Sequence, residues 1–410
     1  MWTWTATPAN WWPCASTPWP HPEGTPVTEI EGETAPGFEA VRDAFAANFA
    51  EGAEVGAAVS VYRHGEKVVD LWGGIADPQE TRPWQRDTLQ AVFSTTKGAT
   101  AACALLLVQR GELDLDAPVQ DYWPEFTAPV KVRWLLTHQA GLPTLDRPVP
   151  LADALAWDPA VAALTVQQPF WEPGTEHGYH GVTFGWLVGE VVRRVSGRSL
   201  GTFFRDEIAE PLGLDFWIGL PKTEHHRVSR FVMPEPDPDA MAGVELDALP
   251  AEMRDMFAAY TDPTSLSMRT FDTVQPRMDN NDPDVLAAEV PATNGVCTAR
   301  ALAGLYAALI GGLLEPDTLA LATTEQAAGP DRILRVPVRW SHGYALWTSG
   351  SPWLPRNMFG YSGLGGSIGF ADPTTGLAFG YVLNRLSDGM TPDPRVARLV
   401  TAAIDSIKEQ

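Results

Sequence analysis

The segments of this chain that are typical of β-strands lie at its two ends, and its longest apolar helical segments lie between them. Near the N-terminus, runs at 57–63 and 68–72 flank a short turn that contains glycine, which predicts a hairpin. Near the C-terminus, runs at 365–370 and 377–383 flank a second turn. The sequence therefore predicts an α+β fold, with an antiparallel sheet built from both termini, flanking helices and a mostly helical inserted subdomain.

The predicted domain boundaries follow from this arrangement. We assign the sheet to about 36–93 and 295–410, and the helical insertion to about 94–294. Within the insertion, about 222–290 is acidic, contains Pro and Met, and is weakly periodic, which indicates a lid of long loops and short helices. Residues 1–35 form an irregular arm, because tryptophans alternate there with prolines that forbid a long helix. The arm is either loose or packed on the domain surface through its tryptophans, and a third alternative is an upstream extension that contributes nothing to function.

Composition narrows the classes of function. The chain has 410 residues, 45% of them hydrophobic, which suits one large domain or two closely packed ones. With 51 acidic and 29 basic residues and no basic run, nucleic acid and anionic membranes are not expected partners. The first basic residue is Arg42, and no apolar segment is long enough to span a bilayer, so we expect a cytoplasmic protein. The three scattered cysteines predict neither a disulfide framework nor a metal site.

Ser94 and Lys97 are the first candidates for chemistry. They lie in Ser94-Thr95-Thr96-Lys97, which follows an apolar lead-in and precedes a small, apolar run that predicts a buried helix. Residues three apart share one helix face, so the Lys97 amine can lie beside the Ser94 hydroxyl and activate it as a nucleophile. The alternative is a capping serine with a solvated lysine, but a buried helix disfavours a solvated lysine.

Tyr179 is the candidate for a third catalytic group. It lies in a loop rich in Pro and Gly that enters an apolar helix predicted at 184–195. Beside Lys97 its phenolate should be favoured, which would make Tyr179 a usable base. The alternative is a tyrosine that only packs at the start of the helix.

Together these segments resemble a known family. The Ser94–Lys97 motif, the 137–143 run, Pro173-Gly174 ahead of Tyr179 and the glycine-rich strand at 360–369 occur in the order and spacing of the serine β-lactamase and penicillin-binding-protein-like family. The similar branch is related to class C β-lactamases and includes the family VIII carboxylesterases. The resemblance covers roughly 36–408, so 36–410 is identified as a β-lactamase/transpeptidase-like hydrolase domain.

The resemblance implies roles for individual residues. Ser94 would be the nucleophile, Lys97 its activator and Tyr179 the general base and acid. The backbone amides of Ser94 and Leu364 would form the oxyanion hole, and His138 would be a hydrogen-bonded core residue. The residues expected to line the substrate site are Tyr361, Ser362, Gly363 and His180.

Two departures from the family pattern bear on the substrate. Penicillin-recognising relatives carry Lys-Thr-Gly on the strand where this chain has Tyr361-Ser362-Gly363, and they carry an asparagine where it has Gly181. The missing lysine removes a cation for a substrate carboxylate, and the missing amide removes a partner for a peptide-like side chain. Both departures favour an esterase over a β-lactamase or D,D-peptidase.

Two other patterns predict no catalytic site. Gly365-Gly366-Ser367-Ile368-Gly369 matches the nucleophile-elbow motif, but a strand and not a helix follows it, so Ser367 is expected to be a strand residue. His177 and His180 lack the acidic or cysteine partners of a zinc site, and we expect neither metal nor cofactor.

The sequence thus predicts a serine hydrolase that forms an acyl-enzyme on Ser94 and acts on small or medium acyl esters. A transacylase would use the same intermediate, and β-lactamase or D,D-peptidase activity is a further alternative. An inactive binding protein is disfavoured, because all three catalytic side chains are present. The sequence leaves the oligomeric state open.

Overall fold

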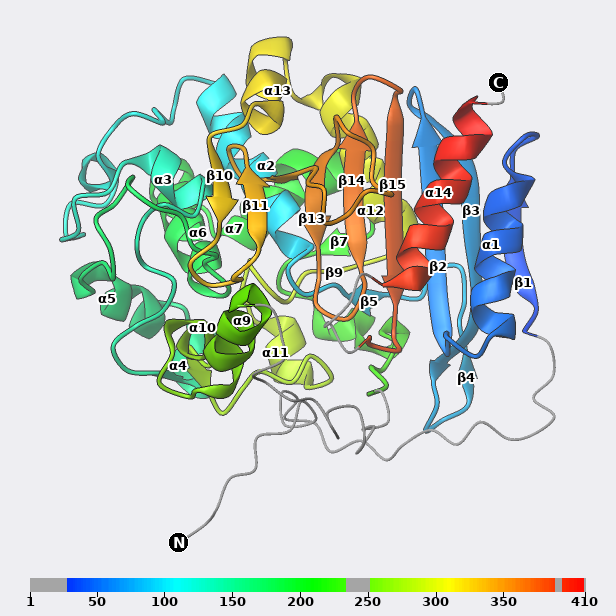
Figure 1. Cartoon of the computed structure of the whole chain (residues 1–410), viewed down its shortest axis with the longest axis horizontal. Coiled ribbons are helices and arrows are strands. Elements are labelled where there is room, and N and C mark those ends of the chain that lie inside the picture. The colour runs from blue at the N-terminus through cyan, green and yellow to red at the C-terminus, as the bar shows by residue number, and fades with distance from the viewer. Residues whose placement is uncertain (1–27, 234–250, 388–392, 409–410) are drawn as a thin grey trace, which may run out of the picture.

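One large antiparallel sheet organises the molecule. The computed structural model describes residues 28–233, 251–387 and 393–408. The strand order is β1-β3-β2-β15-β14-β13-β12-β11-β10, with β4 beside β3, and the neighbours are antiparallel (Figure 1). The strands of this sheet are β1 (Ile30–Thr34), β2 (Gly56–Arg63), β3 (Glu66–Asp77), β4 (Arg82–Pro83), β10 (Ala327–Pro330), β11 (Pro337–Trp340), β12 (Ala345–Leu346), β13 (Phe359–Ser362), β14 (Ile368–Asp372) and β15 (Leu377–Leu383).

The two ends of the chain meet at the centre of this sheet. β2 pairs with β15 from Ala57 opposite Leu383 to Arg63 opposite Leu377. The predicted N-terminal hairpin is confirmed as β2 and β3, and the predicted C-terminal strands as β14 and β15. The α+β fold with a sheet built from both termini is therefore confirmed.

The boundary of the predicted N-terminal arm is wrong at its C-terminal end. The arm was expected to reach residue 35, but β1 (Ile30–Thr34) forms an edge strand on β3. Three of its five residues are exposed, so the strand carries little of the apolar signal by which a sequence indicates a strand. Residues 1–27 of the arm lie outside the described residues.

Helices cover both faces of the sheet. α1 and α14 lie side by side on one face, and α12 packs on β2 and β15 from the other (Figure 1). The predicted helices at 38–49, 184–195 and 299–309 are confirmed as α1, α6 and α12. The helices are α1 (Glu39–Ala50), α2 (Thr96–Gln109), α3 (Val132–Leu136), α4 (Leu151–Leu155), α5 (Asp158–Val166), α6 (Thr183–Ser196), α7 (Leu200–Phe204), α8 (Glu210–Leu212), α9 (Ala251–Thr261), α10 (Leu266–Phe271), α11 (Pro283–Ala287), α12 (Ala299–Ala308), α13 (Pro316–Thr323) and α14 (Pro394–Lys408).

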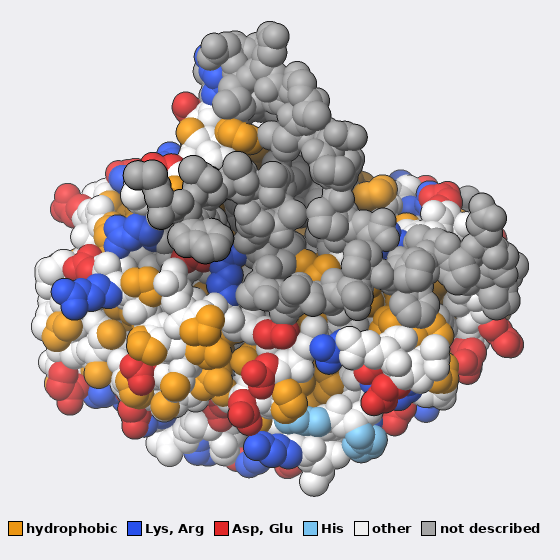
Figure 2. Space-filling view, turned by 90° about the horizontal axis from the view of Figure 1, so that it is seen from below, with side chains coloured by type: hydrophobic (Ala, Val, Ile, Leu, Met, Phe, Trp, Pro, Cys, Tyr) orange, Lys and Arg blue, Asp and Glu red, His pale blue; other side chains and the backbone are white. Residues whose placement is uncertain are grey.

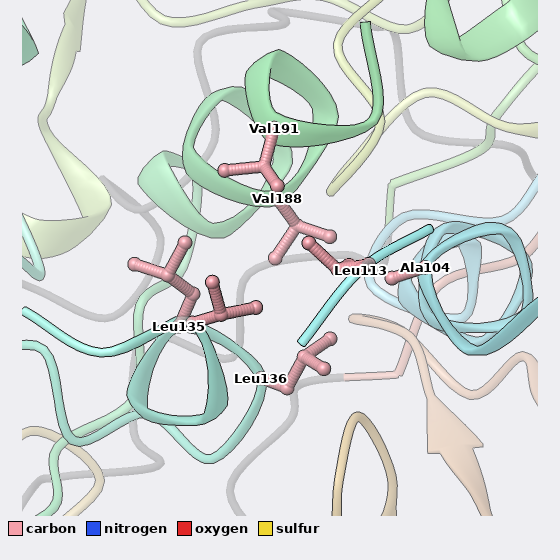
Figure 3. A pocket seen from close by; sticks show the side chains of 7 residues that line it. Ala104, Leu113, Leu135, Leu136, Val188 and Val191 are labelled. Carbon is pink, nitrogen blue, oxygen red and sulfur yellow. The ribbon is translucent and has the colours of Figure 1, made fainter. Parts of the chain in front are cut away.

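Helix α2 is the centre of the helical half. Every residue from Thr96 to Leu107 is buried, because α6, α7, α13 and β13 pack around it. Apolar side chains from α2, α3, α6 and the loop that follows α2 face one another in a seam that has no room for water (Figure 3). The side chains of this seam are Ala104, Leu113, Val132, Leu135, Leu136, Val188 and Val191. A helix packed in this way holds the residues at its N-terminus firmly in place.

A separate three-stranded sheet holds the segment that precedes α2. β9 (Val296–Cys297) pairs with both β5 (Gln90–Ala91) and β7 (Phe216–Trp217). β6 (Val149–Pro150) pairs with β8 (Val274–Gln275), which draws the segment predicted as a lid towards α4. The strand β5 therefore delivers the chain to Ser94 from a fixed position.

The surface offers no continuous basic patch on the face shown in Figure 2, where the described Lys and Arg side chains are dispersed among acidic and polar ones. Among residues 28–233, 251–387 and 393–408, no helix is long and apolar enough to cross a membrane. The cytoplasmic location stays a prediction.

Candidate active site

Ser94 lies in the turn between β5 and α2. The turn closes through hydrogen bonds from the Thr95 amide to the Val92 carbonyl and from the Lys97 amide to the Ser94 carbonyl. Phe93 adopts a φ of 46°, a conformation uncommon for a residue with a side chain. Ser94 itself stays half-exposed, although Thr95, Thr96 and the rest of the helix start are buried. The tight turn thus presents one hydroxyl at the end of a rigid helix.

Lys97 lies one turn along α2 and is fully buried. Its Nζ donates to the carbonyl oxygens of Gly181, at 2.7 Å, and Ala292, at 2.9 Å. The same nitrogen lies 3.3 Å from Ser94 Oγ. A neutral amine has two hydrogens and one lone pair, so with both hydrogens on carbonyls its lone pair can accept the Ser94 proton.

Tyr179 reaches Ser94 from the loop that precedes α6. Its hydroxyl donates to Ser94 Oγ at 2.6 Å, and Lys97 Nζ lies 4.8 Å from the centre of its ring. The ring stacks on Trp340 of β11, with the two planes 12° apart. The structure thus brings together the three side chains proposed from the sequence as the catalytic group.

Burial shifts the pKa of both partners of Ser94. It lowers the pKa of the Lys97 amine well below its usual value, because no carboxylate compensates for the lost water. Burial also raises the pKa of the Tyr179 hydroxyl, against a smaller opposing effect of its hydrogen bond to Ser94. Burial therefore disfavours the phenolate that was expected beside Lys97 and favours the neutral form of both groups. In these forms the Lys97 amine, and not the Tyr179 hydroxyl, is the group that can take up the Ser94 proton.

Two backbone amides face the region of the nucleophile. Neither the Ser94 amide nor the Leu364 amide donates a hydrogen bond to any described residue. A Cβ on Gly363 would come within 2.2 Å of the Val92 carbonyl oxygen and 2.9 Å of Thr95 Oγ1, so only glycine lets this strand end approach the Ser94 turn so closely. Leu364 follows directly, and its side chain is 46% exposed. This arrangement fits an oxyanion hole, which stays a prediction.

Tyr361 does not line the substrate site, contrary to the prediction from the sequence. Its side chain is 4% exposed, and its hydroxyl lies 2.8 Å from His138 Nε2. His138 Nδ1 accepts the His180 amide at 3.1 Å, so Nε2 carries the proton and donates to Tyr361. Alternation along β13 turns Tyr361 inward and leaves Ser362 exposed. Ser362 and half-exposed Gly363 stay candidates for contact with a substrate.

His180 is a second correction. It is fully buried, and its Nδ1 donates to the Gly178 carbonyl at 2.6 Å, while Nε2 accepts the Leu142 amide at 3.0 Å. Both ring nitrogens hold the Tyr179 loop, so the imidazole does not reach a substrate. His138, by contrast, is the hydrogen-bonded core histidine that was predicted, and burial lowers its pKa well below the usual value.

The remaining sequence motifs form no second centre. Ser367 lies one residue before β14, is buried, and donates to the Val92 carbonyl at 2.9 Å, behind the Ser94 turn. In the described ranges, no three His, Cys, Asp or Glu side chains gather closely enough to hold a metal ion. His177 lies beside Asp331, with Nδ1 3.4 Å from its carboxylate.

Asp331 is a positioning residue that sequence reasoning missed. Its Oδ1 accepts the amides of Tyr179, Ile333 and Leu334 at 3.0, 2.8 and 2.9 Å. It follows Gly329-Pro330, a common turn signal, and nothing in the sequence links it to a tyrosine 152 residues away. Its side chain fixes the backbone of Tyr179 against the end of β10.

The segment predicted as a lid contacts this same turn. The Tyr260 hydroxyl of α9 donates to the Leu334 carbonyl at 3.3 Å, and Ser267 Oγ of α10 donates to the Ile333 carbonyl at 2.7 Å. Residues 234–250 of the segment lie outside the described residues. A role of the segment in selecting acyl size stays a prediction.

Comparison with known proteins places this geometry in context. The family model described as "Beta-lactamase" matches residues 41–402. The chain is 37% identical over 377 residues to the esterase/beta-lactamase LipL of Mycobacterium tuberculosis, over 87% of this chain and 83% of that protein.

Two solved structures share the fold over nearly the whole chain. A family VIII carboxylesterase is 39% identical with a TM-score of 0.80, over 92% of this chain and 100% of that one. A penicillin-binding protein homologue from Caulobacter crescentus is 38% identical, also with a TM-score of 0.80 and the same coverage.

Proposed function

Since this chain belongs to the β-lactamase family of serine enzymes, we propose that it is a carboxylesterase that forms an acyl-enzyme on Ser94. The observation that carries the proposal is the contact of Ser94 Oγ with two neutral groups, the Tyr179 hydroxyl at 2.6 Å and the Lys97 amine at 3.3 Å. The names of two similar proteins, LipL and the family VIII carboxylesterase, support ester substrates.

Acylation begins with the attack of Ser94 Oγ on the ester carbonyl carbon. As the new C–O bond forms, the serine proton passes to the lone pair of Lys97, whose lowered pKa suits it to accept a proton near neutral pH. The carbonyl oxygen becomes an oxyanion, which the amides of Ser94 and Leu364 stabilise by hydrogen bonds.

Collapse of the tetrahedral intermediate then breaks the bond to the leaving alkoxide. The alkoxide takes a proton from the Tyr179 hydroxyl, and Tyr179 regains one from the Lys97 ammonium. In deacylation, water attacks the acyl carbon and gives its proton to the same pair, and Ser94 leaves with a proton as the carboxylic acid forms. Each group ends in the protonation state in which it began.

Esters of neutral or apolar acids are the favoured substrates. The strand beside the site has no lysine at position 361, and the tyrosine there is turned inward to His138. A carboxylate-bearing substrate such as a β-lactam would therefore lack the cation that Lys-Thr-Gly provides. β-Lactam hydrolysis is the second candidate, because LipL, which is 37% identical to this chain, is named as both an esterase and a β-lactamase.

The test combines labelling with turnover. A fluorophosphonate should add one phosphonyl group to the wild-type protein, with loss of fluoride, and the adduct should map to the peptide that contains Ser94. Ser94→Ala should abolish labelling and hydrolysis of a short p-nitrophenyl ester, whereas Ser367→Ala should keep both. An adduct on Ser367 would contradict the assignment.

A comparison of substrates then separates the two candidates. p-Nitrophenyl butyrate should be turned over far more efficiently than benzylpenicillin, and the reverse preference would favour the β-lactamase. The same assay with added alcohols or amines detects a transacylase, since the acyl group would then appear on the acceptor and not on water.

A further inference from the structure

We propose that Arg395, near the N-terminal end of α14 on the opposite side of the sheet, is a positioning residue for the oxyanion hole. It would act by holding the turn that presents the Leu364 amide. The inference rests on the proposed function, because it concerns the charge that develops when Ser94 attacks an ester.

The turn that carries Leu364 depends on support from outside. The Gly366 amide donates to the Gly363 carbonyl at 3.2 Å, which leaves Leu364 and Gly365 at the centre of the turn. Gly365 and Gly366 have φ values of 84° and 123°, which favour glycine and give the segment little stiffness of its own. The direction of the Leu364 amide therefore depends on what holds the peptide groups that follow it in the turn.

Arg395 holds one of these groups, the peptide between Gly365 and Gly366. Its Nη2 donates to the Gly365 carbonyl at 3.2 Å, and the Ser387 amide donates to the same oxygen at 3.0 Å. A Cβ on Gly366 would come within 2.6 Å of Asp393 Oδ2 and 3.3 Å of Arg395 Nη2. The Asp393–Arg395 pair, at the start of α14, thus packs directly against the turn.

The guanidinium is itself held from several sides. Nε and Nη2 donate to the two oxygens of Asp393, at 3.0 and 2.6 Å. Nη1 donates to the carbonyls of Ala53, at 3.1 Å, and Arg385, at 2.8 Å, and lies 3.3 Å from Glu54 Oε2. The Glu54 carboxyl also accepts the Tyr381 hydroxyl.

These contacts exclude a direct role in binding substrate. Arg395 is 5% exposed, and its five N–H groups all have protein acceptors, so none is available to a ligand. A planar guanidinium can join carboxylates and a carbonyl in fixed directions, whereas a lysine ammonium cannot reproduce that fork. Arg395 therefore links three segments by hydrogen bonds: α14, the residues just before β2 and the turn that contains Leu364.

Arg395→Lys is the informative variant, because it keeps the buried cation beside Asp393 and loses the bond to the Gly365 carbonyl. We expect kcat for a p-nitrophenyl ester to fall about 10-fold to 100-fold with KM nearly unchanged, since misplacing an oxyanion donor weakens only the transition state. The dissociation constant of an arylboronic acid should rise in parallel. That probe forms an O–B bond to Ser94 with release of the serine proton, and its tetrahedral oxygen occupies the oxyanion hole.

Asn48→Ala is the matched control. Its buried side-chain amide donates to the Arg395 carbonyl at 3.3 Å, so it also joins α1 to α14 but does not contact the turn. It should lower the melting temperature and leave kcat and boronate affinity unchanged. If Arg395→Lys does not fold, Asp393→Asn is the second variant. It keeps the arginine but weakens the ion pair that orients the guanidinium, and it should lower kcat by less than the roughly 10-fold to 100-fold expected for Arg395→Lys.

The possible failures are distinct. An inactive wild type that does not react with the fluorophosphonate would contradict the proposed function. An active wild type with Arg395→Lys and Asn48→Ala indistinguishable in kcat and boronate affinity would contradict only the role of Arg395. A loss in Arg395→Lys confined to KM would also overturn it, because it would indicate contact with the substrate.

Discussion

Lys97 and Arg395 are both basic side chains buried in the same domain, and their surroundings differ in whether a carboxylate lies beside them. Lys97 contacts two backbone carbonyls and the Ser94 hydroxyl, and burial alone lowers its pKa. Arg395 lies between Asp393 and Glu54, and these carboxylates raise its pKa despite burial. The first site destabilises the charged form of its residue, and the second stabilises it.

The difference separates a group that exchanges protons from a group that fixes structure. A buried amine without a counter-ion can lose several pKa units, which brings it into the range where it accepts and returns protons near neutral pH. A buried guanidinium with carboxylate partners stays charged, and breaking such a pair costs about 3–5 kcal/mol. The predictions below therefore test whether Lys97 works because it has no carboxylate beside it and can lose its proton.

The largest effect should come from Lys97→Arg, which puts a permanently charged group into the base position. We expect kcat/KM for the ester to fall by about 10²–10⁴-fold, as far as in Lys97→Ala, because the loss of a general base determines the rate. Measurement of kcat/KM for both variants checks this. Near-wild-type activity in Lys97→Arg would show that a positive charge suffices and would remove the contrast with Arg395.

Tyr179→Phe should lose activity of the same order, since the alkoxide would then lack its proton donor. If Lys97 and Tyr179 act as one relay, the double variant should lose little more than either single one. A double-mutant cycle measures this, with kcat determined for the wild type, the two single variants and the double variant on an ester with a poor leaving group. Additive losses would separate the two residues into independent roles.

The pH dependence of kcat/KM should report Lys97. Because the neutral amine is the active form, activity should fall as the pH drops through the lowered pKa of this group and hold above it. The acid limb should persist in Tyr179→Phe, because the Tyr179 hydroxyl that this variant removes has a raised pKa and does not titrate in that range. A wild-type profile that is flat on the acid side would contradict a neutral Lys97.

Glu54 should produce a smaller effect, on stability. Burial raises its pKa from 4.5 to about 8, against the opposing pull of Arg395. The folded state then keeps a proton that the unfolded state loses. The contribution of Glu54 to stability is therefore greatest below pH 4.5 and declines as the pH rises towards 8, by up to about 1.4 kcal/mol per pH unit. Chemical unfolding at pH 5 and pH 8 measures this. The free energy of unfolding of Glu54→Gln, relative to that of the wild type, should be higher at pH 8 than at pH 5. A constant difference would contradict this.

The contrast between Lys97 and Arg395 also shows which parts of the site the sequence could reveal. Ser94, Lys97 and Tyr179 were predictable because one helix turn joins the first two and a loop motif marks the third. The strands at both ends of the chain were predictable from their apolar runs. The partners of Arg395 were not, because Glu54 and Gly365 lie 341 and 30 residues away and are brought together only by the pairing of β2 with β15.

Orientation was the other element that the sequence did not determine. Tyr361 and Ser362 are neighbours on one strand, and the resemblance assigned both to the substrate site. The pleat sends them to opposite faces, and which face is buried depends on His138 and Trp340, which pack from other segments. The state of Tyr179 was wrong for a related reason, since the extent of burial is not visible in a motif.

The smallest expected effect concerns substrate preference at position 361. Tyr361→Lys places a further amine in the core, without a carboxylate bonded to the residue it replaces, and leaves His138 without its hydroxyl partner. Because the wild-type side chain is 4% exposed, the new amine should not meet a β-lactam carboxylate, and the ratio of benzylpenicillin to p-nitrophenyl butyrate turnover should stay unchanged. Stability should fall by about 1–3 kcal/mol, the usual cost of a buried group left unpaired.

Tyr361→Phe, which removes the hydroxyl without adding an amine, is the matched variant and should show the same unchanged ratio. A shift towards benzylpenicillin in Tyr361→Lys alone would mean that position 361 reaches the substrate. The new amine would then bind a substrate carboxylate, which is a role that neither Lys97 nor Arg395 has.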